Sequence, residues 1–244
     1  MTDNDTTSST TTALVTGANK GLGLETTRRL AELGWTVWLG ARDAESGQAA
    51  ADSVAADQPG ADVRFVQLDV TSDDSVRAAY DVVAAAGGLD VLVNNAGVIG
   101  NAYDTVQTTP ADFLPVYAVN VLGPVRVTHT FAPLLAASPR ARLVMVSSGL
   151  GTAAFNNDPS RDEFGVPGMV YQSSKAALNM IANQYAKALP GVRVASVDPG
   201  YTATDLNGHS GHQTVREGTD AIVTAASADE IPAAHFDRHG PIPV

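Results

Sequence analysis

Two side chains that could form a proton donor lie four residues apart in the second half of the chain. They are Tyr171 and Lys175, in the run MVYQSSKAAL. Residues four apart on a helix share one face, so the phenol and the ammonium can meet. A nearby ammonium favours the phenolate, and it should lower the pKa of Tyr171 from its usual value of about 10. The same pair is also compatible with an ordinary contact along a helix, so other residues are needed to distinguish a proton donor from such a contact.

The overall composition is that of a globular chain with a sizeable core. The 244 residues are 44% hydrophobic and carry a formal net charge of −11. An acidic chain without a basic stripe is a poor binder of nucleic acids and of anionic membranes, so we expect neither partner. The chain has no cysteine, which excludes disulfides, thiolate metal sites and cysteine nucleophiles.

The first residues differ in character from the rest of the chain. The run MTDNDTTSSTTT is acidic and rich in hydroxyl groups, and it lacks the apolar stretch of a signal peptide. We therefore expect residues 1–11 to form a flexible tail and residues 12–244 to form a single domain. No run of 18 or more apolar residues follows, and we expect a cytoplasmic protein.

Short apolar runs alternate with longer alanine-rich stretches along most of the sequence. This alternation predicts an α/β fold with one doubly wound, Rossmann-like parallel sheet and helices on both faces. Runs that are apolar throughout are expected where both faces of a sheet are covered. Glycines at 34, 87, 88 and 191 directly precede predicted strands, where helices commonly end. The predicted strands are 13–16, 36–40, 63–68, 91–94, 142–147 and 192–197.

Two segments interrupt this alternation. Residues 155–167 are rich in Asn, Asp, Pro and Gly, and residues 201–214 contain His209 and His212. Long irregular loops in a compact α/β domain are usually functional or mobile. The two histidines have no acidic partner at metal-ligand spacing, so we interpret them as loop residues near a pocket mouth and expect no metal site.

A glycine-rich loop joins the first predicted strand to a helix that should begin near Leu22. Its sequence, TGANKGLG at 16–23, has the spacing G-x-x-x-G-x-G. Gly17 can make the tight turn, while Gly21 and Gly23 allow close approach of the backbone to a ligand and of the helix to the strand. The unpaired N–H groups at the start of the helix can bind a pyrophosphate. The loop therefore predicts a dinucleotide site.

Arg42 follows the second predicted strand, where dinucleotide enzymes distinguish their cofactors. An acidic residue there would bind a ribose 2′-hydroxyl, whereas an arginine can hold a 2′-phosphate. Ala41 occupies the position that would hold the acid, and Lys20 adds a second positive charge. Both cations could instead be solvated surface charges. Together they favour NADP(H).

Further motifs follow in a fixed order: Asp69 in LDV, NNAG at 94–97, Asn120 in VNVLG, Ser148 in VSSGLG, and Pro199 with Gly200. With TGANKGLG and the Tyr171–Lys175 pair, the chain from residue 13 to about residue 204 resembles the short-chain dehydrogenase/reductase family. TGANKGLG with Arg42 most resembles the NADPH-dependent carbonyl reductases of that family.

The resemblance implies a catalytic set of Asn120, Ser148, Tyr171 and Lys175. It implies that Lys175 also binds the nicotinamide ribose and that Asn120 fixes a water molecule linking Lys175 to solvent. Asp69 would lie beside the adenine, although an Asp after a strand is also a good helix N-cap. The expected cofactor contacts are Gly17, Asn19, Lys20, Gly21, Leu22, Gly23, Arg42, Asp69, Val70, Asn95, Ala96, Gly97, Tyr171, Lys175, Pro199, Gly200, Thr202 and Thr204.

The residue types fit reduction of an aldehyde or ketone by hydride transfer. Hydride addition places negative charge on the carbonyl oxygen, which then needs a hydrogen-bond donor and a proton. Tyr171 would supply the proton, and Ser148 would hold the oxygen in line. Ser147 is interpreted as structural. The expected apolar pocket residues are Val98, Ile99, Leu150, Phe155, Met169 and Tyr201.

Ser148 and Tyr171 are further apart than in the common family pattern, so about ten residues within 153–168 look inserted. We expect this segment to cover either the substrate site or a helix face used elsewhere for oligomer contacts. The oligomeric state stays open between monomer, homodimer and homotetramer. Two other functions also stay open: an NADP(H)-binding sensor without catalysis, and an alcohol dehydrogenase working in the oxidative direction.

Overall fold

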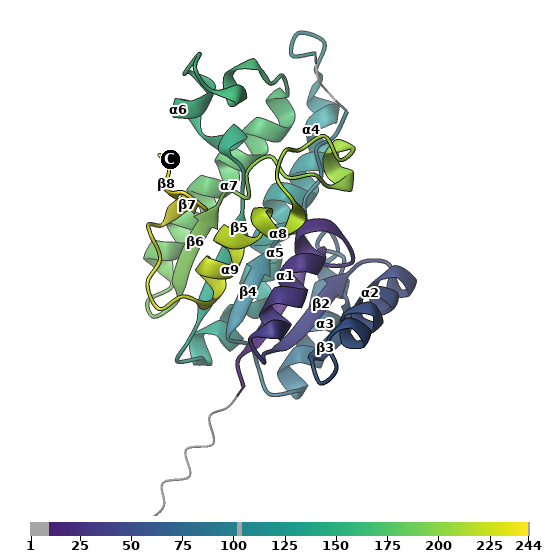
Figure 1. The fold of residues 1–244 in the computed structure, drawn as a ribbon. Helices are drawn as coiled ribbons and strands as arrows, with labels where there is room; N and C mark the ends of the chain where they lie inside the picture. The colour runs from purple at the N-terminus through teal and green to yellow at the C-terminus, as the bar shows by residue number, and fades with distance from the viewer. Residues whose placement is uncertain (1–9, 102–103, 244) are drawn as a thin grey trace, which may run out of the picture.

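One eight-stranded sheet organises the molecule. The computed structural model describes residues 10–101 and 104–243. The strand order is β3-β2-β1-β4-β5-β6-β7-β8, and every neighbouring pair is parallel except β7 and β8 (Figure 1). The strands are β1 Thr12–Thr16, β2 Thr36–Ala41, β3 Asp62–Gln67, β4 Val91–Asn94, β5 Arg142–Val146, β6 Arg193–Val197, β7 His235–Asp237 and β8 Gly240–Pro241.

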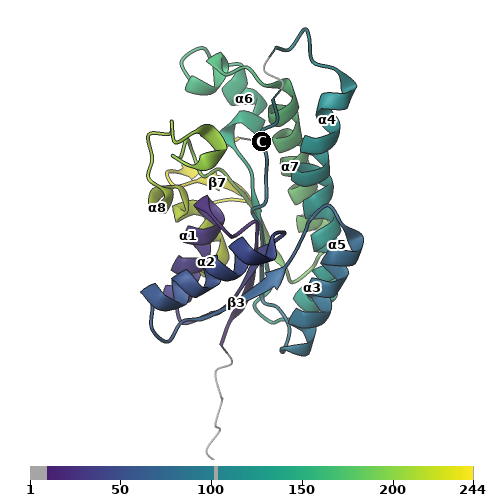
Figure 2. The ribbon, with the colours of Figure 1, turned by 90° about the vertical axis from the view of Figure 1, so that its right-hand side faces the viewer.

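Helices cover both faces of this sheet. Figure 2 shows α1 and α2 on one side and α3, α5 and α7 on the other. The longer helices are α1 Gly21–Glu32, α2 Ala44–Asp57, α3 Asp73–Ala85, α4 Pro110–Tyr117, α5 Gly123–Ala137, α7 Met169–Ala188 and α9 Asp220–Ser227. The short ones are the π-helix η1 Ala118–Leu122, α6 Ala153–Asn156, α8 Val215–Gly218 and the 3₁₀ turns η2 Gly149–Gly151, η3 Asp162–Gly165 and η4 Asp205–Asn207.

The core consists of two apolar clusters separated by the sheet. One contains side chains from α1, α2 and α9, such as Leu30, Val54 and Ile222. The other contains side chains from α3, α5 and α7, such as Phe131 and Leu178. Strand residues alternate between the two clusters, which explains why the central strands are apolar on both faces.

The six predicted strands are confirmed to within one or two residues at each end. Glycines 34, 87, 88 and 191 all have positive φ, as helix-ending turns require. The first helix begins at Gly21, one residue before its predicted start. Strands β7 and β8 were not predicted, because three and two residues near Pro and Gly carry no readable periodicity.

The predicted tail lies mostly outside the described residues. Within it, the carbonyl of Thr11 accepts a hydrogen bond from Thr36 N at 3.0 Å, so pairing with β2 already begins there. Within the described residues, none of the helices combines the length and the apolar character needed to span a lipid bilayer.

Candidate active site

The glycine loop between β1 and α1 packs too closely against neighbouring backbone to admit side chains at two of its glycines. Gly17 has a φ of 62°, and a Cβ there would lie 2.9 Å from Ala96 Cα. A Cβ on Gly23 would lie 2.5 Å from the carbonyl oxygen of Gly17. Gly21 also has positive φ. The loop can therefore fold only with glycine, and its open backbone at the start of α1 suits a dinucleotide pyrophosphate.

The ends of β1 and β4 are joined beside this loop. The Thr16 hydroxyl accepts hydrogen bonds from the backbone N–H groups of Asn95 and Ala96, each at 3.0 Å. Asn95 Nδ2 donates in return to the carbonyls of Thr16 and Gly17 at 2.8 and 3.1 Å. Because β1 lies between β2 and β4, this is the point where the strand order reverses and where ligands of such sheets bind.

Arg42 and Asp69 lie at the ends of the neighbouring strands β2 and β3. The pKa of Asp69 is lowered, first by hydrogen bonds from Thr71 and also by the positive charge of Arg42. The N-cap of α3 is Ser72, so Asp69 does not cap that helix. Val70 follows directly, and its carbonyl accepts a hydrogen bond from Arg126 at 2.7 Å. Arg42 and Asp69 thus share one corner of the sheet edge.

Lys20 and Asn19 have partners elsewhere on this edge. Lys20 Nζ forms an ion pair with Asp205 Oδ2 at 2.9 Å, although its side chain is 64% exposed. Asn19 Nδ2 donates to Ser46 Oγ at 3.1 Å. Lys20 therefore connects the glycine loop to the loop after β6 through an exposed ion pair.

Ser148 and Tyr171 meet above the end of β5. Ser148 lies two residues beyond the strand, and its hydroxyl accepts a hydrogen bond from Leu150 N at 3.2 Å. The Ser148 side chain forms a hydrogen bond with Tyr171, and this bond by itself lowers the pKa of the phenol. Ser147 turns inward, where its hydroxyl contacts the carbonyl of Lys175 at 3.4 Å. The structural interpretation of Ser147 agrees with this contact.

The predicted lowering of the Tyr171 pKa is wrong for the protein alone. Burial raises the pKa of Tyr171 well above its usual value, and the negative charge of Asp198 raises it further. Lys175 Nζ lies 5.6 Å from the centre of the tyrosine ring and donates a hydrogen bond to Val146 O at 2.8 Å. Desolvation and Asp198 therefore set the direction of the shift, and helical spacing carries no information about burial.

Lys175 is itself buried, with 4% of its surface exposed. Burial lowers the pKa of its ammonium to about 8, while Asp198 acts in the opposite direction. A Cβ on Gly97 would lie 3.6 Å from Lys175 Nζ and 3.5 Å from Asn120 Oδ1. The glycine after NNA thus keeps the space between these two polar side chains open.

Asn120 is fixed by hydrogen bonds on both sides of its amide. It lies fully buried in η1, accepts from Val98 N at 2.9 Å and donates to Val98 O at 2.8 Å. Its Nδ2 also donates to Ser174 Oγ at 3.0 Å, and Ser174 donates to the carbonyl of Tyr171 at 2.6 Å. Ser174 links α7 to η1 and was missed, since a serine inside a helix gives no signal in the sequence.

The segment 153–168 packs in two places. Its helix α6 faces α7 across a hollow of about 240 Å³, and η3 reaches the turn that follows Ser148. Arg161 forms an ion pair with Glu163 at 2.9 Å, and its guanidinium lies 3.4 Å from the ring centre of Phe155. Glu163 approaches Gly149, where a Cβ would be 2.8 Å from its carboxylate. The segment thus contacts both α7 and the turn after Ser148, and its role over the substrate site or over a helix face stays a prediction.

The loop after β6 returns to the glycine loop. Gly200 has a φ of 70°, and the Thr202 hydroxyl donates to the carbonyl of Pro199 at 3.1 Å. A Cβ on Gly21 would lie 3.7 Å from Thr204 Cγ2, so Thr204 lies directly over the start of α1. Tyr201 is half exposed, and its hydroxyl contacts Ser210.

The expectation that neither histidine of this loop has an acidic partner at metal-ligand spacing is wrong for His209, because Asp205 lies four residues before it. His209 Nε2 contacts Asp205 Oδ1 at 2.9 Å, and the His212 ring packs edge-on against Tyr201. Over residues 10–101 and 104–243, no group of three or more His, Asp or Glu side chains could hold a metal ion.

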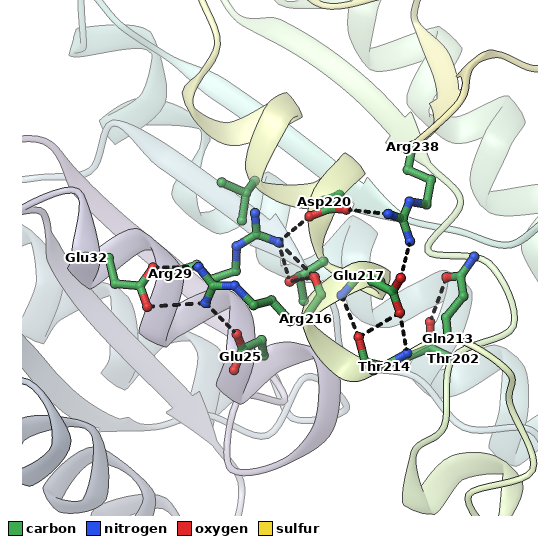
Figure 3. Close-up of polar contacts among 12 residues, drawn as sticks. Glu25, Arg29, Glu32, Thr202, Gln213, Thr214, Arg216, Glu217, Asp220 and Arg238 are labelled. Carbon is green, nitrogen blue, oxygen red and sulfur yellow. Dashed lines mark hydrogen bonds and ion pairs between the residues drawn. The ribbon is translucent and has the colours of Figure 1, made fainter.

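A network of ion pairs and hydrogen bonds attaches the following segment to α1 (Figure 3). Arg29 Nη1 donates to Asp220 Oδ1 and to Thr219 Oγ1, each at 2.8 Å. Arg216 pairs with Glu25 and Glu32 on α1. Glu217 forms an ion pair with Arg238 and accepts hydrogen bonds from the hydroxyl and the backbone N–H of Thr214. The end of the 201–214 loop is thereby fixed to the helix that begins at the glycine loop.

Comparison with known proteins agrees with this arrangement. The chain is 34% identical over 224 residues to "Short-chain dehydrogenase anuI" of Penicillium roqueforti, covering 88% of this chain and 87% of that protein. The structure resembles NADPH-bound carbonyl reductase from chicken fatty liver, with a TM-score of 0.82, 26% identity and coverage of 96% and 98%. It also resembles salutaridine reductase from Papaver somniferum, with a TM-score of 0.80, 26% identity and coverage of 93% and 99%. Residues 11–214 match the sequence profile described as short chain dehydrogenase, and the chain belongs to this oxidoreductase family.

Proposed function

We propose that this protein is an NADPH-dependent reductase that converts the carbonyl of an aldehyde or ketone into an alcohol. The observation that carries the proposal is that Ser148, Tyr171, Lys175 and Asn120 lie together beside the glycine loop. A module that only binds a dinucleotide has no need of a buried phenol and ammonium next to a serine hydroxyl. The NADPH bound to the chicken carbonyl reductase supports the choice of cofactor.

Three groups of residues would hold the cofactor. The loop at 16–23 and the start of α1 would bind the pyrophosphate, Arg42 and Asp69 the adenosine end, and Lys175 the nicotinamide ribose. The glycine positions fit this role because a Cβ at Gly17 or Gly23 would collide with neighbouring protein atoms and displace the loop from the start of α1. When bound, NADPH supplies the hydride.

The protein's own residues would stabilise and protonate the developing alkoxide. Ser148 would donate a hydrogen bond to the substrate oxygen, and Tyr171 would donate the proton. In the protein alone, burial keeps Tyr171 protonated, which suits a proton donor in the reductive direction. Lys175 would stabilise the phenolate that remains after proton transfer, and Asn120 borders the space beside its ammonium.

Arg42 carries the preference for NADPH over NADH in this proposal. Its guanidinium is exposed at the end of β2, and Asp69 lies close enough for the two charges to interact. An exposed guanidinium can bind a phosphate with two parallel hydrogen bonds. Lys20 is paired with Asp205, so Arg42 is the stronger candidate for the 2′-phosphate.

A panel of aldehydes and ketones, mixed with purified protein and NADPH, tests the proposed function. We expect NADPH consumption with at least one activated carbonyl compound and formation of the matching alcohol. Binding of NADPH without turnover over the whole panel would instead favour a cofactor-binding sensor. Faster turnover with alcohols and NADP⁺ at neutral pH would favour the oxidative direction.

A further inference from the structure

Asp198 is a buried carboxylate for which the reaction described above has no role. It directly follows β6 and precedes Pro199, and only 7% of its surface is exposed. Its Oδ1 accepts a hydrogen bond from Gly200 N at 2.9 Å. The backbone N–H of Gly149 also donates a hydrogen bond to the Asp198 carboxylate. The carboxylate therefore joins the turn after β6 to the turn after Ser148.

Close packing around Gly149 makes this junction possible. A Cβ on Gly149 would lie 2.8 Å from Asp198 Oδ2 and 2.8 Å from Glu163 Oε1. Any side chain at Gly149 would displace one of the two carboxylates. The same turn carries Ser148, so the position of Asp198 and the position of the serine hydroxyl are coupled through one residue.

Charged groups from several elements face Asp198. Glu163 on η3 and Asp237 on β7 are negative and disfavour its ionised form. Arg161, which precedes η3, is positive. Lys175 and the phenol of Tyr171 face it from α7. The carboxylate thus lies between the segment 153–168 and the proposed proton donor.

We propose that Asp198 is a positioning residue for carbonyl reduction, whose carboxylate fixes the Ser148 turn against the Pro199 turn and brings a negative charge towards the proposed proton donor. This role rests on the proposed function. A carboxylate beside a phenol opposes the phenolate and supports the neighbouring ammonium of Lys175. Both effects favour the form of the site that is ready to reduce a carbonyl.

The directions of the pKa shifts agree with this role. Asp198 contributes to the raised pKa of Tyr171, after burial, and it partly offsets the lowering of the Lys175 pKa. Burial raises the pKa of Asp198 itself, so its charge develops at higher pH than for an exposed Asp.

Replacement of Asp198 by Asn removes the charge and keeps one hydrogen-bond acceptor. In Asp198→Asn we expect the alkaline limb of the pH profile of kcat/KM for NADPH-dependent reduction to move down by about one pH unit. Asp237→Asn is the matched control, because Asp237 faces Asp198 but does not act on Tyr171. Its alkaline limb should stay where it is in the wild type. A uniform loss of kcat/KM without a shift, or equal shifts in both variants, would overturn the proposal.

A second measurement follows the phenol without turnover. The tyrosinate absorbance of Tyr171 is obtained by subtracting the titration of a Tyr171→Phe variant, in both the wild-type and the Asp198→Asn background. Tyr171 should ionise at lower pH in the background that lacks the carboxylate; identical titrations would overturn the proposal. If Asp198→Asn does not fold, Asp198→Ser, whose hydroxyl can accept one of the two N–H groups, takes its place. The protein could also reduce no carbonyl compound and still show the shifted tyrosinate titration. That result would refute the proposed function and the role of Asp198 in reduction, but it would establish the effect of Asp198 on Tyr171.

Discussion

Lys175 Nζ donates a hydrogen bond of 2.8 Å to the carbonyl oxygen of Val146, the last residue of β5. The strand that carries Ser148 at its end therefore also holds the ammonium beside Tyr171. This hydrogen bond satisfies one of the three N–H groups of the buried Lys175 ammonium. Burial lowers the pKa of the ammonium to about 8. The protein thus maintains a partly desolvated cation at this place, at a cost in stability that can be measured.

Replacing Lys175 by Met should remove the loss of stability that the buried ammonium causes, and it should also abolish carbonyl reduction. A lysine whose folded pKa is lowered destabilises the fold most below pH 8, and the cost declines as the pH rises towards the usual lysine pKa. The stability of Lys175→Met relative to wild type should therefore fall between pH 8 and pH 10, by up to about 3 kcal/mol, since one pKa unit corresponds to about 1.4 kcal/mol. Urea denaturation at several pH values measures it. A difference that stays constant with pH would contradict the lowered pKa.

Substitution of Arg42 should change the choice of cofactor. In Arg42→Asp we expect weaker NADPH binding and a loss of about tenfold or more in the preference for NADPH over NADH, because a charge-assisted phosphate contact is exchanged for repulsion. Steady-state kinetics with both cofactors gives the ratio. Arg64→Ala is the control, since Arg64 lies on the adjacent strand β3 and pairs with Asp62. An unchanged ratio in Arg42→Asp would refute the assignment.

A side chain at Gly23 should strongly weaken cofactor binding. A Cβ there would lie 2.5 Å from both Gly17 O and Asn95 Nδ2, so Gly23→Ala must displace the loop or the end of β4. We expect NADPH affinity to fall by about 100-fold, in proportion to the loss of the phosphate-binding backbone geometry. Gly165→Ala serves as the control, because nothing lies within 4 Å of a Cβ at that position. Calorimetric titration with NADPH distinguishes the two variants.

The network around Arg29 should contribute to stability as well as to the position of the loop. Its side chain is 17% exposed and contacts Asp220, Thr219 and the carbonyl of Arg216. We expect Arg29→Ala to lower the free energy of unfolding by about 2 kcal/mol, because hydrogen bonds to charged groups are stronger than neutral ones. Arg64→Ala removes a more exposed ion pair and should lower the free energy of unfolding by less than about 1 kcal/mol. Equal losses in the two variants would show that the network adds nothing beyond surface pairing.

The sheet could be predicted from sequence because its strands are apolar runs separated by helix-ending glycines. Strands β7 and β8 could not, since three and two residues beside Pro and Gly leave no pattern. The residues proposed for catalysis were readable as ordered motifs. Asp198 and Ser174 were not singled out, because only the fold brings Asp198 between Gly149 and Gly200 and Ser174 between Asn120 and Tyr171.

Electrostatics was the least predictable part of the site. The spacing of Tyr171 and Lys175 indicates proximity, but the raised pKa of the phenol follows from burial and from Asp198, which is far along the chain. The charge of Lys20 was visible in the sequence, whereas its ion pair with Asp205 depends on how the loop after β6 folds back. Local spacing therefore identifies candidate groups, and the surrounding fold sets their protonation.

The central claim is that Tyr171 donates the proton to a carbonyl oxygen, and Tyr171→Phe tests it most directly. Tyr185→Phe is the matched control on the same helix, where the hydroxyl contacts the carbonyl of Val125 at 3.4 Å. With NADPH and a carbonyl substrate that the wild type reduces, we predict that Tyr171→Phe binds NADPH but loses at least about 100-fold in kcat, while Tyr185→Phe turns over at close to the wild-type rate. Wild-type turnover by Tyr171→Phe would contradict the account.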